Sequence, residues 1–281
     1  MSILKIFSSL LIFVFLFLSL PISLCVQGTE LDQKFDFERA YQDYVFTLDV
    51  YNTKHSEYVL SKAQYEQAKT LVAQSKARES ALGMLAARDD VVITYLTAVR
   101  MRMVEAEGLS DTVKQGIFSR LDAEVDWFKD HKARLSSSGT LKDLEEDSAE
   151  AANRFGRLSQ TIAYETLATI PFGTLSLLRQ ETSNILKGIN EKISQIRING
   201  DKDTSKLERW AFEVDSKITR SLDKEIEAQS LIVNFVPRDR QGKTSYFQNF
   251  NDIISKLDES RQLLRDAIGS MKEIIRNITT V

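Results

Sequence analysis

Apolar residues recur three and four positions apart along most of the chain. Within residues 247–281 one row with this spacing is apolar at every position except Arg261. Its apolar members are Phe250, Ile254, Leu257, Leu264, Ile268, Met271, Ile275 and Ile278. This spacing is typical of a coiled-coil interface or of the core face of a long bundle helix. The pattern therefore predicts a long C-terminal helix that buries one side.

Tyrosines mark the first predicted helix, which begins after Asp36. Tyr44, Tyr51, Tyr58 and Tyr65 recur every seven residues, so they lie along one side of a helix. A tyrosine combines a large apolar ring with a hydroxyl that stays near water. We interpret these four residues as a packing stripe at the edge of a core. The alternative hypothesis is an interaction stripe for a partner helix or a glycan.

The apolar row restarts one position out of phase after the polar stretch 73–80. Asp89 lies in the same row as the apolar residues Leu82, Leu85, Val92 and Leu96. Residues 36–107 therefore form either one long helix or two helices joined near residues 74–79. No Gly-Pro or Asn-Gly turn interrupts the stretch, so we expect one long helix.

Further helices are predicted where a residue that caps helix N-termini precedes an apolar row. The predicted starts are Ser110 or Asp111, Thr140 with Asp143, Ser205 with Glu208, and Ser245 with Gln248. Pro171 is expected to stop or kink its helix, and Asn199-Gly200 to end the next one. The predicted fold is all-α, with about six helices in an elongated antiparallel bundle.

The first 25 residues differ from this helical body. An uninterrupted apolar run, Leu10–Leu18, lies between Lys5 and Pro21, and small or weakly polar residues such as Ser23 and Cys25 follow. A positive start, an apolar centre and small residues are typical of a signal peptide. Cleavage after Cys25 leaves residues 26–281 as a single all-helical domain.

Two alternatives for the leader stay open. Residues 6–24 are just long enough to remain as a membrane tether. Cys25 could instead carry a lipid, although Leu24 departs from the small residue that precedes the cysteine of bacterial lipoproteins. In each case the body is expected to be extracytoplasmic, because the positive end stays in the cytoplasm.

Charge and cysteine content exclude some function classes. Removing residues 1–25 takes away Lys5 alone among 37 Lys and Arg, which leaves 36 basic and 40 acidic residues. This mixed charge argues against nucleic acid, which requires a basic face. The remaining body has no cysteine, so packing alone must hold it together outside the cytoplasm.

One segment resembles a phosphate-binding loop. Residues 237–244, Pro-Arg-Asp-Arg-Gln-Gly-Lys-Thr, end as such a loop does and follow an apolar run. However, Pro237 occupies the place of the opening glycine, and proline lacks the backbone N–H that wraps a phosphate. We interpret the segment as a polar connection between helices and predict no cofactor.

The histidines and acidic pairs give no metal or catalytic motif. Neither His55 nor His131 follows a glutamate by three residues, as the ligands of di-iron bundles do. We interpret His55 as packed in the tyrosine row and His131 as favoured near a helix C-terminus. Asp89-Asp90 is interpreted as a solvated helix face in preference to a calcium site. The sequence predicts no enzyme, with no catalytic or metal-binding residues.

Two segments carry a resemblance. Residues 35–47, Phe-Asp-Phe-Glu-Arg-Ala-Tyr-Gln-Asp-Tyr-Val-Phe-Thr, and residues 87–96, Ala-Arg-Asp-Asp-Val-Val-Ile-Thr-Tyr-Leu, resemble uncharacterised exported helical proteins of small-genome bacteria. The resemblance covers mainly residues 35–105 and implies a bacterial cell-envelope setting with no known activity. A looser similarity to the helical hairpins of periplasmic adaptor proteins lacks the β-rich modules of those adaptors.

These patterns lead to two hypotheses about function. The first is a non-enzymatic extracytoplasmic scaffold or protein-interaction protein of the cell envelope, which contacts a protein partner or itself through helices. The second is an envelope chaperone or lipid-binding helical protein, with Tyr44, Tyr51, Tyr58 and Tyr65 lining its groove. Both follow from an export leader on a body of heptad-patterned helices.

Overall fold

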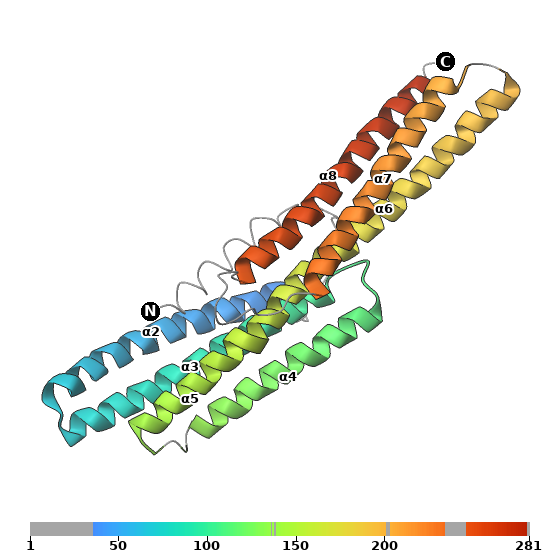
Figure 1. The fold of residues 1–281 in the computed structure, drawn as a ribbon. Coiled ribbons are helices and arrows are strands. Elements are labelled where there is room, and N and C mark those ends of the chain that lie inside the picture. Colours follow the sequence, from blue (N-terminus) through green and yellow to red (C-terminus); the bar gives the residue numbers. More distant parts are fainter. Residues whose placement is uncertain (1–35, 136, 138, 201–202, 234–245, 280–281) are drawn as a thin grey trace, which may run out of the picture. The chain divides into compact units, whose positions relative to one another are not determined.

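The described part of the protein is helical and contains no strand, which confirms the all-α prediction (Figure 1). The computed structural model describes residues 36–135, 137, 139–200, 203–233 and 246–279. The predicted leader, residues 1–25, lies outside these ranges, as do Ser245 and the segment 237–244. Within these ranges, no helix is long and apolar enough to cross a membrane.

The first two helices form a hairpin, so the expectation of one long helix over residues 36–107 was wrong. Helix α2 (Phe37–Ala68) ends at Lys69, which adopts a left-handed conformation with φ 47°. Helix α3 (Leu71–Val104) begins after Thr70, whose side chain accepts a hydrogen bond from the backbone of Ala73. A left-handed residue followed by an N-cap reverses the chain within two residues.

Contacts along the hairpin show that α2 and α3 are antiparallel. The backbone N–H of Phe37, at the start of α2, donates to Glu105 beyond the end of α3. Farther along, the hydroxyls of Thr47 and Thr94 lie 2.7 Å apart. The hydroxyls of Ser61 and Ser80 also meet, close to the turn. Buried residues on α3 make this helix the centre of the first half of the fold.

Helices α4 (Asp111–Leu135) and α5 (Leu141–Arg154) pack against α3. The predicted capping box at the start of α5 is confirmed, because Thr140 and Asp143 exchange backbone-to-side-chain hydrogen bonds of 2.7 and 3.2 Å. Apolar residues from α3, α4 and α5 meet in one cluster near the α4–α5 connection. The buried members of this cluster are Ala81, Leu85, Leu135 and Leu144.

A short π-helix, η1 (Phe155–Ser159), joins α5 directly to α6 (Gln160–Asn199). Helix α6 continues through Pro171, so of the two predicted alternatives, a stop or a kink, the stop is wrong. Proline removes one backbone hydrogen bond from a helix, and packing on both sides can outweigh that loss. The predicted end at Asn199-Gly200 is confirmed, with Gly200 in the left-handed conformation at φ 72°.

The α3–α4 turn rests on α6 at a close backbone approach. Gly108 has φ 75°, and a Cβ atom at Gly173 would overlap the backbone oxygen of Glu107. A side chain at Gly108 would in turn overlap the backbone oxygen of Gly173. Glycine at both positions allows the turn and the helix to touch.

Helices α7 (Ser205–Val233) and α8 (Tyr246–Thr279) run antiparallel and both pack against α6. Lys217 donates to Ser270 at 2.8 Å, and Lys224 lies 3.2 Å from Glu259. Ahead of α7 the capping contacts come from Asp203 and Thr204 in place of the predicted Ser205 side chain. Since α5, η1 and α6 are continuous, the described residues form six helical segments, as predicted.

The core face of α8 is rotated by one position from the predicted row. Leu257, Leu264 and Met271 are buried as expected, whereas Ile275 is 42 % exposed. The other buried positions are Ile253, Ser260, Ala267 and Ile274. The core row therefore passes through Ser260, which explains why Arg261 did not fit the predicted one.

Candidate functional site

A buried ion pair links α3 to α4. Asp89 is 0 % and His131 1 % exposed, and Nδ1 of His131 lies 2.6 Å from Oδ2 of Asp89. The other ring nitrogen, Nε2, lies 3.1 Å from the backbone oxygen of Asp147 on α5. The ring of Trp127 stacks on the imidazole with centroids 5.1 Å apart. The prediction of a solvated face was therefore wrong for Asp89.

The geometry determines the charge of His131. Both nitrogens face oxygen acceptors, and only the imidazolium donates from both. Burial lowers the pKa of His131, but the hydrogen bond and charge of Asp89 and the Asp147 carbonyl raise it above the ordinary value. A histidine with both nitrogens engaged has none available as a general base. Through these two hydrogen bonds, His131 of α4 links α3 and α5.

Arg88 lies beside the Asp89 carboxylate. Its guanidinium Nη1 donates to the side chain of Ser148 at 2.9 Å, and Nη2 lies 3.8 Å from Oδ1 of Asp89. Neither Nη2 nor Oδ1 has a hydrogen-bond partner among the described residues. Burial lowers the pKa of Arg88 while the charge of Asp89 raises it. Beside it, Asp90 pairs with Lys132 at 2.7 Å near the surface.

One group of side chains in the described residues could bring metal ligands together. Single ligand atoms of His131, Asp147 and Glu150 lie within 4.8 Å of one another. Glu150 is exposed and lies 3.8 Å from Arg134, and Nε2 of His131 already donates to the Asp147 carbonyl. An ion would have to displace that hydrogen bond, so the present contacts account for the arrangement without one.

A second buried carboxylate stands at the π-helix. Glu124 of α4 accepts two hydrogen bonds from Arg154, of 3.0 and 2.6 Å. It also accepts one from Ser159 at 2.8 Å, and Arg154 lies over the ring of Trp127. The extra residue in a π-turn shifts the following side chains, and π-turns often occur at functional sites. Here the turn lies where Arg154 and Ser159 reach the same carboxylate.

A third polar cluster crosses the core of α6, α7 and α8. Arg179 pairs with Glu225, whose Oε1 accepts a hydrogen bond from Ser260 at 3.1 Å. The hydroxyls of Ser260 and Ser221 lie 2.9 Å apart. These groups are hydrogen-bonded to one another within a row of apolar core positions. Such a layer favours one register between helices.

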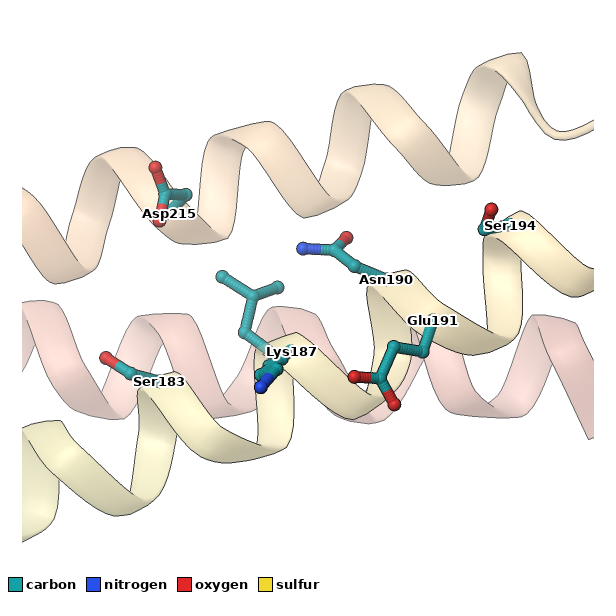
Figure 2. A pocket seen from close by; sticks show the side chains of 7 residues that line it. Ser183, Lys187, Asn190, Glu191, Ser194 and Asp215 are labelled. Atoms are coloured by element: carbon teal, nitrogen blue, oxygen red, sulfur yellow. The ribbon is translucent and has the colours of Figure 1, made fainter.

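A shallow groove of about 470 Å³ lies along α6 beside α7 (Figure 2). Figure 2 shows Asp215 on α7 and the remaining labelled residues on α6. Its lining mixes both charges with hydroxyl and amide groups: Ser183, Leu186, Lys187, Asn190, Glu191, Ser194 and Asp215. This open groove presents neither histidine nor cysteine and pairs no nucleophile with a base.

The four tyrosines of the predicted interaction stripe lie along α2, and contacts place two of them against other helices. Tyr44 is buried with its ring centroid 5.7 Å from that of Tyr95 on α3, and burial raises the pKa of Tyr44 to about 12. Tyr58 packs on the cluster near the α4–α5 connection. Tyr51 and Tyr65 are half-buried. Their role as an interaction stripe stays a prediction.

Helix α7 carries apolar side chains on a face that is separate from its core face. The α7 stripe consists of the apolar residues Phe212, Leu222, Ile226 and Val233 together with the exposed Thr219 between them. Phe212, Ile226 and Val233 are 73 %, 55 % and 77 % exposed. Positions 212, 219, 226 and 233 are seven residues apart, as in a coiled coil. The sequence prediction missed this stripe because it assigned Leu222 to the core face.

No protein-family profile matches the chain, and neither a curated protein nor a solved structure matches it.

Proposed function

We propose that the protein is a non-enzymatic, extracytoplasmic scaffold of the cell envelope that binds helices of other protein molecules. The α7 stripe is the observation that supports this proposal. A helix on the surface of a bundle normally keeps polar residues on its outer side. Helix α7 fills its core face with other residues and still exposes Phe212, Ile226 and Val233. An exposed apolar patch of this kind favours an interaction site.

The buried polar groups support a structural role as well. The buried side chains of Asp89, Glu124 and Glu225 each contact a basic residue on another helix. Charges that are engaged in this way hold helices in register, and they do not reach the groove beside α7. We therefore propose that the protein binds its partners through the surface of its helices.

Photo-crosslinking of the protein in its native envelope tests the proposed binding. A benzophenone side chain at Thr219, in the middle of the α7 stripe, is expected to form a defined adduct. The same group at Glu213, exposed on α7 outside the stripe, is the matched control. An adduct of twice the chain mass indicates a second copy, and an adduct with one envelope protein indicates a hetero-partner. Equal crosslinking from both positions, or none from Thr219, would contradict the proposal.

Substitution of the stripe gives an independent readout. Phe212→Ser with Ile226→Ser should abolish the adduct and leave helix content unchanged, because both side chains are exposed. Phe46→Ser, at a side chain 69 % exposed on α2, should leave it intact. Loss of the adduct in the control alone would place the interaction elsewhere.

Export is the second part of the proposal, and it rests on the leader pattern of residues 1–25. The N-terminal peptide of the chain purified from cells tests it by mass spectrometry. A chain beginning at Val26 supports cleavage, and a retained segment 6–24 in the membrane fraction supports a tether. Recovery of an intact leader in the cytoplasmic fraction would contradict export.

A further inference from the structure

The turn between α2 and α3 presents two aliphatic side chains to solvent. Leu71 and Val72 are 82 % and 80 % exposed, the highest values among the large hydrophobic residues in the described part of the chain. They stand in the first turn of α3, directly after the N-cap Thr70. Neither side chain contributes to the core, so the fold does not explain why they are apolar.

The charge around this pair has one sign. Residues 67–78, which we name the hairpin tip, contain Lys69, Lys76 and Arg78 and no acidic residue. Lys69 and Lys76 are exposed, and neither forms an ion pair within the described residues. Carboxylates flank the tip only at Glu66 and Glu79. The tip therefore combines apolar and cationic groups on a chain whose net charge is −3.

The tip also extends beyond the other helices that pack on this hairpin. The cluster shared with α4 and α5 begins at Ala81 of α3. Between Leu71 and Ala81 the helix is about 15 Å long at 1.5 Å per residue. In this stretch Ala77 is buried, and the buried Ser61 of α2 meets Ser80 of α3. In Figure 1 this turn lies at the lower left, between the blue helix α2 and the teal helix α3.

We propose that the hairpin tip is a contact site for the surface of an anionic lipid bilayer. Leu71 and Val72 enter the boundary between headgroups and acyl chains, while the lysines keep their ammonium groups at the headgroup level. Anionic lipids attract juxtamembrane lysines, which supplies the charge complementarity. A bilayer surface needs no shaped pocket for this contact. This contact is separate from the α7 stripe.

An environment-sensitive fluorophore tests the contact at the tip itself. In the full chain with Cys25→Ser, Val72→Cys carries an NBD (nitrobenzoxadiazole) group and is mixed with phosphatidylcholine vesicles with or without phosphatidylglycerol. The emission is expected to shift to the blue with the anionic vesicles and not with the neutral ones. Ile198→Cys is the matched control, because Ile198 is an aliphatic residue 77 % exposed near another turn, with Asp203 close by in sequence.

The lysines give the second arm of the test. Lys69→Glu with Lys76→Glu should weaken the response at Val72 by at least about tenfold, because both charges then repel the anionic surface. Helix content must be unchanged, which is expected at two exposed positions. Three results would overturn the proposal: equal shifts at Val72 and Ile198, equal shifts with neutral vesicles, or a shift only when an envelope protein replaces the vesicles.

Discussion

Burying Asp89 together with His131 makes the stability of the protein depend on pH. Asp89 and the Asp147 carbonyl raise the pKa of His131 against the effects of burial and of Arg88. A raised pKa stabilises the fold fully below the ordinary value of about 6.5. This stabilisation is lost as the pH rises through the higher folded-state value. The free energy of unfolding should therefore decline from about pH 6.5 upwards.

Asp89→Asn should remove this decline and cost on the order of 3 kcal/mol at pH 6, because it breaks a buried pair. Urea unfolding at several pH values between 5 and 9 measures both effects. Asp90→Asn is the control, since the half-buried Asp90 pairs with Lys132 near the surface. It should cost about 0–1 kcal/mol and leave the pH profile unchanged. A flat wild-type profile would show that folding does not raise the pKa of His131.

The sequence contained a sign of this pair that its interpretation did not use. Asp89 falls in the apolar row of its helix, and a carboxylate at a core position requires a buried partner. The carboxylate of Glu124 and the hydroxyl of Ser260 also take core positions, so they too require buried partners. The partner itself cannot be read from the sequence, because His131 lies 42 residues away and meets Asp89 only after α3 and α4 pack.

At the scale of single elements, a helix end could be predicted only where the sequence has a residue that is typical of that position. Gly200 and the Thr140 capping box were predicted, because glycine and threonine are typical of those positions. The turn after α2 was missed because Lys69 adopts the left-handed conformation that glycine or asparagine usually takes. Pro171 caused the opposite error, because a helix end or a kink was expected there and α6 continues through it. Two local errors of opposite kind left the helix count unchanged.

Two glycines of α6 give a matched test of the close approach to the α3–α4 turn. Gly173→Ala should destabilise the protein by about 1–3 kcal/mol, because the new Cβ overlaps the backbone oxygen of Glu107. Gly188→Ala, in the same helix, should stabilise it by about 0.5–1 kcal/mol, because the new Cβ would meet no atom of another element within 4 Å. Thermal unfolding of the two variants measures the difference. Equal effects would show that the turn moves away at no cost.

At the scale of the whole molecule, α6 connects two groups of helices in the described chain. Near its start Glu165 accepts two hydrogen bonds of 2.7 Å from Arg120 on α4. Near its end Arg197 lies 3.5 Å from Glu208 on α7. Between these contacts the helix has no break, so neither group can lose its packing without exposing part of α6. The sequence predicted the all-α bundle but not this role, because Pro171 was expected to stop or kink the helix.

The shared helix predicts that both groups unfold in one cooperative transition. The chain has two tryptophans, and they report on different groups: Trp127 on α4 stacks on His131, and Trp210 on α7 lies under Lys206. Trp210→Phe leaves the first reporter and Trp127→Phe the second. In urea, the fluorescence midpoint of each variant should coincide with its own midpoint from far-UV circular dichroism, the test of two-state behaviour. The free energies of unfolding that the two methods give for one variant, extrapolated to water, should agree within about 10–15 %. If fluorescence at Trp210 changed before the circular dichroism of the same variant, α7 and α8 would unfold independently, and the continuous α6 would not couple the two groups.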